Sequence, residues 1–529
     1  MSRSGGAHAW VLLAALGLGV LLVGVELMVT AVALPQIIAD LADWTRLREA
    51  SWIVNGYLVA YVAVMPLAGR AADRYSVPAL FGLSLIVFAA GCIAAGAARD
   101  LEWLIAARVV QGLGAGAIVP LATAGASHLF EGHTRARAIG LIGALTFLGM
   151  AAGPFVGATI LQSIQLPGPE LLAPAWRWVF YLGAPLALLA GLYTWAASPG
   201  WSASRDTTGL DLYGAALFTV AVASGLLALT VIGSGTGGLL APVPLALIAG
   251  AALVLAALHS TRARVPFIDP RAFADRTFGG AVLLSLLTGY ALATAIIGGA
   301  VFIDRVRYAG PAEQQVALGA LAGAIAVGAL GSGFALRRLG SVALSLAGLA
   351  LAIAGLLVAA SAGPDSDLGV LVVGLATFGL GFGLTVTARS TAAVEALGRA
   401  AFGVASGVVT VARMLGMGIG LAALTVLGSN RIEALSVVLV DQAARDAVLP
   451  PALQGRPLED YLVVDALERW ASGQAAGILA ALFLVAAAVT AVAILPTLAM
   501  SDTPRAGRRQ GREGSIDVVE EASPAGLAI

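Results

Sequence analysis

The sequence predicts an all-α polytopic membrane protein with about fourteen transmembrane helices. Of its 529 residues, 59% are hydrophobic and only 11% are charged, and the mean hydropathy is +0.93. Soluble domains usually contain about 25% charged residues. The long apolar stretches must cross the bilayer as helices, because an open strand would leave backbone groups unpaired in lipid. The formal net charge is zero, so we expect no nucleic-acid partner.

The candidate spans follow one another with short breaks. They comprise residues 10–34, 51–69, 78–98, 101–125, 137–162, 177–197, 211–232, 241–260, 278–302, 314–335, 341–361, 368–388, 403–428 and 473–497. An even number of spans places both ends of the chain on the same side of the membrane.

The distribution of arginine between the connections predicts the orientation. If the N-terminus is cytoplasmic, the inner connections contain Arg70, Arg74, Arg135, Arg137, Arg262, Arg264, Arg271, Arg276, Arg337, Arg338, Arg389 and Arg399. The short outer connections contain chiefly Arg46, Arg48, Arg99, Arg305 and Arg307. Cytoplasmic loops carry the excess of basic residues, so we expect both termini to be cytoplasmic.

The first span carries one ionisable side chain, Glu26. A charged carboxylate near the centre of a membrane helix costs about 2.5 kcal/mol or more. Such a residue usually faces a protein interior or a water-filled path, where it can take up and release a proton. We therefore predict that Glu26 is the proton site of a transporter. The alternative is a carboxylate permanently paired with a basic residue on another helix.

The connection after the second span reads PLAGRAADRYSVPAL and contains Gly69, Asp73 and Arg74. An acid at this turn can lie against the N-terminus of a neighbouring helix, and an arginine can bind a carboxylate. Both contacts would hold the cytoplasmic side closed, so we expect these three residues to form a cytoplasmic gate.

The fourth span opens with ARVVQGLGAGAIVP, which contains Arg108, Gln111, Gly112, Gly114 and Gly116. Small residues let neighbouring helices approach closely. We expect Gln111 to line a central cavity, together with Asn55 of the second span. For both amides the alternative is a hydrogen bond between helices.

Arg108 and Glu26 are expected at nearly the same depth. Each lies about seven or eight residues from the outer end of its span, and the helix rises about 1.5 Å per residue. A proton-dependent contact between them is therefore predicted if the two helices are neighbours. The alternative is that Arg108 binds backbone carbonyl groups for purely structural reasons.

The fifth span contains GMAAGPFVGA, with Gly149, Gly153, Pro154 and Gly157. Pro154 removes a helix hydrogen bond, and the glycines allow close packing and bending.

These three stretches resemble three sequence motifs of the major facilitator superfamily, and they occur in the same order and on the same helices. They are the loop motif G-x-L-x-D-R-x-G-R-K/R, the fourth-helix motif R-x-x-Q-G-x-G-x-G and the exporter motif G-x-x-x-G-P-x-x-G-G. Ser76 replaces the second glycine of the loop motif, and Ala158 replaces the last glycine of the exporter motif. A weak second copy of the loop motif occurs at Gly333, Arg338 and Gly340.

The resemblance implies the major facilitator fold, which has two six-helix halves. The span count and the segment WRWVFYLGAPLA resemble the fourteen-helix drug–proton antiporter branch, in which two linker helices separate the halves. We therefore expect an N-terminal half over residues 1–200, linker helices over 201–262 and a C-terminal half over 263–500. Residues 501–529 are polar and are expected to form a disordered cytoplasmic tail.

A narrower resemblance is to actinobacterial exporters of lipids and drugs that work with a lipoprotein and are implicated in triacylglyceride export. It is carried by Glu26, by the segment 403–428 with Arg413, and by the long outer segment 429–472. Two amphipathic stretches in this outer segment predict that the last two membrane helices continue beyond the bilayer.

That group has an acid beside the exporter motif, where this chain has Thr146 and Phe147. The resemblance therefore implies that one of the group's ion pairs is missing and that Glu26 pairs with Arg108 or Arg413.

The segment 262–277 mixes arginine with Phe267, Ile268 and Phe273. This pattern suits a cytoplasmic segment that lies at the lipid surface, and the alternative is a solvated loop.

We find no metal-ligand cluster, nucleophile elbow or phosphate-binding loop, so we expect neither an enzyme nor a cofactor beyond a proton gradient. The cavity is expected to be mainly apolar, which favours lipids or lipophilic drugs as substrates.

We predict a proton-coupled secondary transporter that exports triacylglyceride-like lipids from the inner membrane of a bacterium. We expect a monomer and a periplasmic lipoprotein acceptor. The alternatives are a broad multidrug/proton antiporter and a passive lipid scramblase.

Overall fold

The computed structural model describes residues 3–501, except 42–46, 51, 131, 165–173, 200, 202–210, 233–240, 264–265, 268–269, 398–404, 406 and 425–440. Within the described residues the chain is helical, and fourteen helical stretches are long and apolar enough to span a membrane. These fourteen stretches correspond one to one to the predicted spans, which confirms the all-α polytopic fold class.

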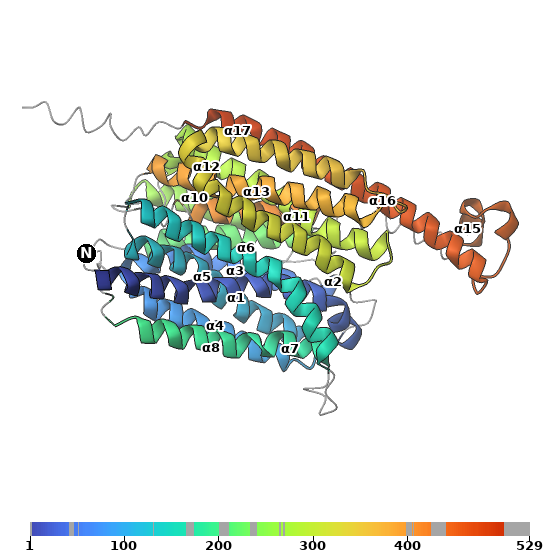
Figure 1. Ribbon diagram of the computed structural model, residues 1–529, viewed down its shortest axis with the longest axis horizontal. Coiled ribbons are helices and arrows are strands. Elements are labelled where there is room, and N and C mark those ends of the chain that lie inside the picture. The colour runs from blue at the N-terminus through green and yellow to red at the C-terminus, as the bar shows by residue number, and fades with distance from the viewer. Residues whose placement is uncertain are drawn as a thin grey trace, which may run out of the picture.

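The first part of the chain forms the blue-to-teal layer of Figure 1. Its helices are α1 (Arg3–Leu41), α2 (Leu47–Ala50), α3 (Trp52–Arg74), α4 (Val77–Gly96), α5 (Leu101–Leu129), α6 (Gly132–Ser163), α7 (Ala175–Tyr181) and α8 (Gly183–Ala197). The short helices α7 and α8 follow each other to make one membrane span. α1 packs against α6 and α8, and α5 packs between α3 and α4.

The second part of the chain is coloured from green through yellow to red in Figure 1. After α9 (Leu212–Val231) and α10 (Pro242–Ser260) come α11 (Arg276–Arg305), α12 (Pro311–Ala360), α13 (Leu368–Leu397), a helix over Gly407–Leu424, α15 (Gln442–Val448), α16 (Tyr461–Val492) and α17 (Ile494–Ala499). α9 and α10 pack against each other, and α9 also packs against α3. The start of α1 and the end of α17 lie at the same end of the bundle, here called the terminal end (Figure 1).

Aspartates begin several of these helices. Asp100 accepts a hydrogen bond of 2.7 Å from the backbone N–H of Trp103 at the start of α5. Asp275 accepts bonds from the N–H groups of Thr277 and Phe278 at the start of α11. Such caps satisfy N–H groups that have no partner within the helix, and they fix where each helix enters the membrane region.

Two membrane spans follow each other within α12, with a sharp change of direction at Gly340. This glycine has φ 76° and ψ 170°, a conformation that only glycine adopts readily. Gly340 belongs to the weak second copy of the loop motif, so this part of the motif has a backbone role in the turn between the two spans.

The motif glycines bring helices into backbone contact. A Cβ atom on Gly149 of α6 would overlap the carbonyl oxygen of Leu21 in α1, and one on Gly116 of α5 would overlap the carbonyl oxygen of Tyr61 in α3. Gly153 likewise lies against Val25, with 2.8 Å between its added Cβ and the Val25 carbonyl oxygen. Larger residues would separate these helices, because interhelical contact in membranes depends on small residues.

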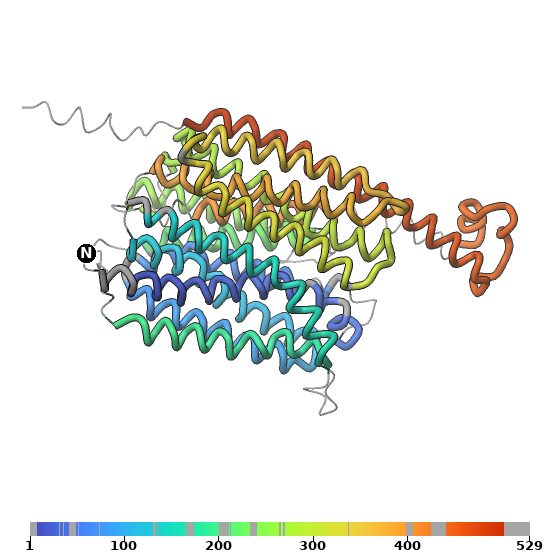
Figure 2. The backbone as a smooth tube through the Cα atoms, in the orientation of Figure 1, coloured from blue at the N-terminus to red at the C-terminus, as the bar shows by residue number. Residues whose placement is uncertain are grey.

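The last membrane helix extends beyond the bundle at the end opposite the termini. α16 runs unbroken from the extension into the bundle, and α15 lies beside its outer part (Figure 2). Leu449, Val463 and Leu467 form a small hydrophobic cluster that holds the extension together. The predicted continuation of the last helix is therefore observed, whereas the corresponding part of the helix before it lies outside the described residues.

Two predictions about polar segments need correction. Arg389, assigned from sequence to a connection, is only 1% exposed, because α13 continues to Leu397. Phe267, assigned to the lipid surface or a solvated loop, is buried and packs against Phe218 with 5.6 Å between ring centroids. Phe273 in the same segment is exposed.

Candidate functional site

The carboxylate of Glu26 lies inside the protein and binds Arg108. Arg108 Nη1 is 2.8 Å from Glu26 Oε1, and both residues are at most 2% exposed. Thr30, one helical turn further along α1, donates a hydrogen bond of 3.3 Å to the same carboxylate oxygen. Glu26 and Arg108, which we expected at the same depth in the membrane, are therefore in contact. Arg108 is the partner of Glu26 in this structure.

Contacts with α3 and with two aromatic rings hold the guanidinium group of Arg108 in place. Its Nε donates a hydrogen bond of 3.2 Å to the carbonyl oxygen of Ile53 in α3. Its guanidinium carbon lies 4.1 Å from the ring centroid of Tyr57 and 5.6 Å from that of Phe180. Aromatic faces attract a desolvated cation, so these rings partly replace the water that the guanidinium has lost.

Gln111 links this pair to α4. Its side-chain oxygen accepts a hydrogen bond from Arg108 Nη1, and its Nε2 donates to Cys92 Sγ at 3.0 Å. Gly183, the first residue of α8, leaves room for the side chains of Glu26 and Cys92. A Cβ at this position would lie 3.7 Å from Glu26 Oε2 and 3.1 Å from Cys92 Sγ. We call Glu26, Arg108, Gln111 and Cys92 the buried polar cluster.

A small cavity lies between the two layers of helices, and Leu27, the residue after Glu26 in α1, contributes to its wall. Its wall combines residues of α1, α3 and α6 with residues of α11 and the helix over 407–424. The lining residues are Val23, Gly24, Leu27, Tyr61, Thr146, Phe147, Met150, Leu292, Arg413, Met414 and Met417. The wall is mainly apolar, as the sequence predicts, but three methionines contribute to it. Asn55 and Gln111, which we expected to line the cavity, do not, and Gln111 lies in the buried polar cluster instead.

Arg413 has the one formal charge among these lining residues. Its guanidinium carbon lies 5.5 Å from the ring centroid of Phe147, on α6. Among the described residues we find no hydrogen bond or ion pair for Arg413, and its Nε is buried without a partner. Gly289 of α11 sets its position, because a Cβ there would overlap the Arg413 carbonyl oxygen.

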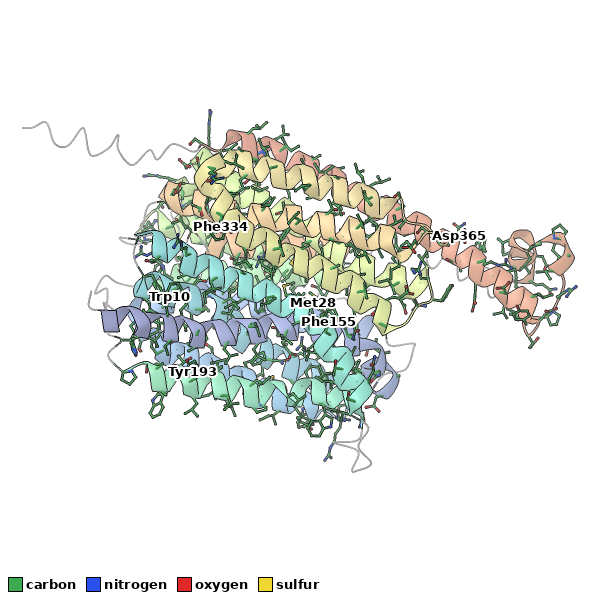
Figure 3. The ribbon with its side chains drawn as sticks, in the orientation of Figure 1. Trp10, Met28, Phe155, Tyr193, Phe334 and Asp365 are labelled. Atoms are coloured by element: carbon green, nitrogen blue, oxygen red, sulfur yellow. The ribbon has the colours of Figure 1, made fainter. Side chains whose placement is uncertain are left out.

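The layers meet beyond the cavity, toward the extension. Gln315 of α12 donates a hydrogen bond of 3.3 Å to the carbonyl oxygen of Pro154, and Gly319 lies against the ring of Phe155. Met28 also belongs to the hydrophobic cluster that joins the layers there. Figure 3 shows Met28 and Phe155 at this boundary. The exporter motif thus contributes Pro154 to the contact between the layers.

The predicted gate residues lie at the terminal end of the bundle. Gly69, Asp73 and Arg74 belong to the last turns of α3. Apart from the neighbouring backbone of α3, no atom of the described residues lies within 4 Å of the position of a Cβ on Gly69. The side chains of Asp73 and Arg74 lie outside the described part of the structure, so their gate contacts stay a prediction.

A second polar cluster, at the terminal end, was not apparent from sequence. Asp211 accepts hydrogen bonds from the N–H groups of Gly214 at 2.7 Å and Phe267 at 2.9 Å, and it lies 2.8 Å from His259 Nε2. Arg70 of α3 donates to the carbonyl oxygens of Pro266, at 2.8 Å, and Phe267. The linker helices α9 and α10 are thereby tied to α3 through the segment that leads into α11.

This terminal cluster predicts a dependence of stability on pH. Burial raises the pKa of the Asp211 carboxyl, but hydrogen bonds from Gly214, Phe267 and His259 outweigh burial and hold the pKa below its ordinary value. The stabilisation is therefore complete above the ordinary aspartate pKa of about 3.9 and is lost as pH falls through the lower folded-state value. We expect Asp211→Asn to lower the free energy of unfolding at pH 7 by about 1–3 kcal/mol.

Thermal unfolding of the purified protein at a series of pH values measures this effect. The difference between wild type and Asp211→Asn should shrink below about pH 4. The control is Asp465→Asn, an exposed carboxylate that pairs with Arg469 on the surface of α16. A difference that stays constant across the series would show that Asp211 acts through shape alone.

Comparison with known proteins identifies the family of this chain. The sequence pattern of the Major Facilitator Superfamily matches residues 16–421. The chain belongs to the major facilitator superfamily. It is therefore a membrane transporter of this superfamily and not an enzyme.

Similar superfamily members include proteins named triacylglyceride transporters. The one from Mycolicibacterium hassiacum is 32% identical over 82% of this chain and 81% of its own length. The one from Mycobacterium tuberculosis is 30% identical over 77% of this chain and 79% of its own length. Among solved structures, a bacterial homologue of the human lysosomal transporter Spinster, inward-facing and unoccupied, matches with a TM-score of 0.63. It is 18% identical and aligns over 95% of this chain and 99% of that one, so it shares the fold.

Proposed function

We propose that this superfamily member is a proton-coupled exporter of hydrophobic lipids. The observation that carries the proposal is the position of Glu26, a buried carboxylate that pairs with one arginine and precedes Leu27 in the wall of an apolar cavity between the layers. The cavity has few fixed polar groups, which suits a lipid better than a sugar or amino acid. The names of the relatives support triacylglycerides as cargo.

The ion pair of Glu26 and Arg108 gives a mechanism for proton coupling. Protonation of Glu26 removes the attraction that holds Arg108, and the two protonation states then favour different arrangements of the helices that carry them. Because α1 contributes both Glu26 and the cavity residues Val23 and Leu27, a change at the carboxylate reaches the lipid site directly. Proton entry would thereby be linked to movement of lipid in the opposite direction.

The proposed setting is the inner membrane of a bacterium, with a monomer whose two termini are cytoplasmic. The excess of arginine at the terminal end supports this orientation. The contact between the layers toward the extension supports loading from the cytoplasmic side or the inner leaflet. The extension of α15 and α16 would then face the periplasm, where it could deliver lipid to a lipoprotein acceptor.

Transport in proteoliposomes tests this function. We expect a fluorescent triacylglyceride to be exported several times faster with an imposed pH gradient than after an ionophore has collapsed it. Transport that is equally fast in both conditions would identify a passive scramblase. Gradient-driven movement of a cationic dye without movement of the lipid would identify a multidrug antiporter.

A further inference from the structure

Two arginines beside the cavity have no acidic partner among the residues that the structure describes. Arg413 lies in the cavity wall, and Arg389 lies in α13, 1% exposed. Arg389 Nη1 donates hydrogen bonds to the hydroxyl groups of Thr288, at 2.6 Å, and Thr385, at 3.3 Å. Hydroxyl groups and carbonyls can satisfy the hydrogen bonds of a guanidinium, but they do not neutralise its charge.

An aromatic pair connects the two arginines. Phe147 of α6 and Phe382 of α13 meet edge to face, with 6.1 Å between ring centroids. Arg413 lies over Phe147 at 5.5 Å, and Arg389 lies over Phe382 at 5.0 Å. Ring faces attract cations, but their contribution is smaller than the free energy lost when a cation leaves water. This side of the cavity therefore carries positive charge that nothing described there offsets.

The other lining residues do not supply an anion. They are apolar apart from the hydroxyl groups of Tyr61 and Thr146, and the nearest acid on α1, Glu26, is engaged by Arg108. Arg413 Nε is a buried donor without a partner. A donor of this kind gains most from an ionised acceptor, because charge-assisted hydrogen bonds are stronger than neutral ones.

We propose that Arg413 selects lipids with an anionic headgroup, a phosphate or carboxylate, whose acyl chain occupies the apolar part of the cavity. This inference rests on the proposed export of lipids, and for this chain it assigns an anionic lipid as cargo where the names of the relatives point to a neutral one. Leu27, Met414 and Met417 provide apolar contacts for the acyl chain.

Equilibrium binding in nanodiscs tests the proposal with two ligands that differ only in the headgroup: 1-oleoyl lysophosphatidic acid and 1-monooleoylglycerol. Wild type should bind the phosphate-bearing lipid at least about tenfold more tightly. Arg413→Gln should remove this preference while keeping the affinity for monooleoylglycerol, and Arg413→Lys should keep part of it. The matched control is Arg305→Gln, which removes an equal charge from a side chain that is 64% exposed.

Equal affinities in wild type, or a preference that survives in Arg413→Gln, would overturn the inference and leave neutral-lipid transport in place. If neither lipid binds, the proposed function fails as well. Glycerol 3-phosphate binding as tightly as the lysophospholipid would overturn the lipid assignment in favour of a soluble phosphate. If Arg413→Gln does not fold, the wild-type comparison and Arg413→Lys decide the question.

Discussion

Glu26→Gln is expected to abolish gradient-driven transport while the protein stays folded. Glutamine keeps the shape of the side chain and can still accept a hydrogen bond from Arg108, which also retains Ile53, Gln111 and the ring of Tyr57. It cannot exchange a proton. The ratio of transport rates with and without the pH gradient should therefore fall to about one, because a site with a single protonation state cannot couple to the gradient.

The measurement is lipid export from proteoliposomes at matched protein density, with and without an ionophore. Glu313→Gln provides the control, because Glu313 also pairs with an arginine, Arg307 at 2.8 Å, but lies near the surface at the start of α12. A Glu26→Gln protein that still responds fully to the gradient would move the coupling site elsewhere.

Arg108→Met is expected to cause the largest loss of stability. Methionine fills much of the same volume between Tyr57 and Phe180, so the main effect is that Glu26 is left buried without its cation. Breaking one side of a buried ion pair costs about 3–5 kcal/mol. The double variant Glu26→Gln/Arg108→Met should recover most of this loss, since it leaves neither charge unpaired.

Unfolding of the wild type, both single variants and the double variant in detergent completes this thermodynamic cycle. Arg305→Met, at an exposed position, should change the free energy of unfolding by no more than about 0.5 kcal/mol. If Arg108→Met were as stable as wild type, the carboxyl group of Glu26 would have to be neutral in the resting protein.

The fold was largely predictable because membrane helices have a strong one-dimensional signal. Apolar length alone located all fourteen spans. The motif glycines were predictable as packing sites, and the structure shows Gly116 and Gly149 in backbone contact with neighbouring helices. Counting residues from helix ends also placed Glu26 and Arg108 at one level, because the helical rise is constant.

What sequence could not predict depends on contacts between distant segments. Arg389 was assigned to a connection because a charge normally marks the end of a span, yet Thr288 and Phe382 accommodate it within the protein. The terminal cluster depends on Asp211 meeting Phe267, 56 residues further along the chain. No local sequence pattern encodes a contact between residues so far apart. The sequence showed that Arg413 is a charge within an apolar span, but it did not show that Phe147 lies beside it.

The continuity of α16 has a mechanical consequence. Its 32 residues form one rod about 48 Å long, from the hydrophobic cluster outside the bundle to the level where α17 begins. A rod without a hinge cannot bend to absorb a tilt at its base. Any rocking of the helices around α16 must therefore swing its far tip through a wider arc than any point inside the bilayer.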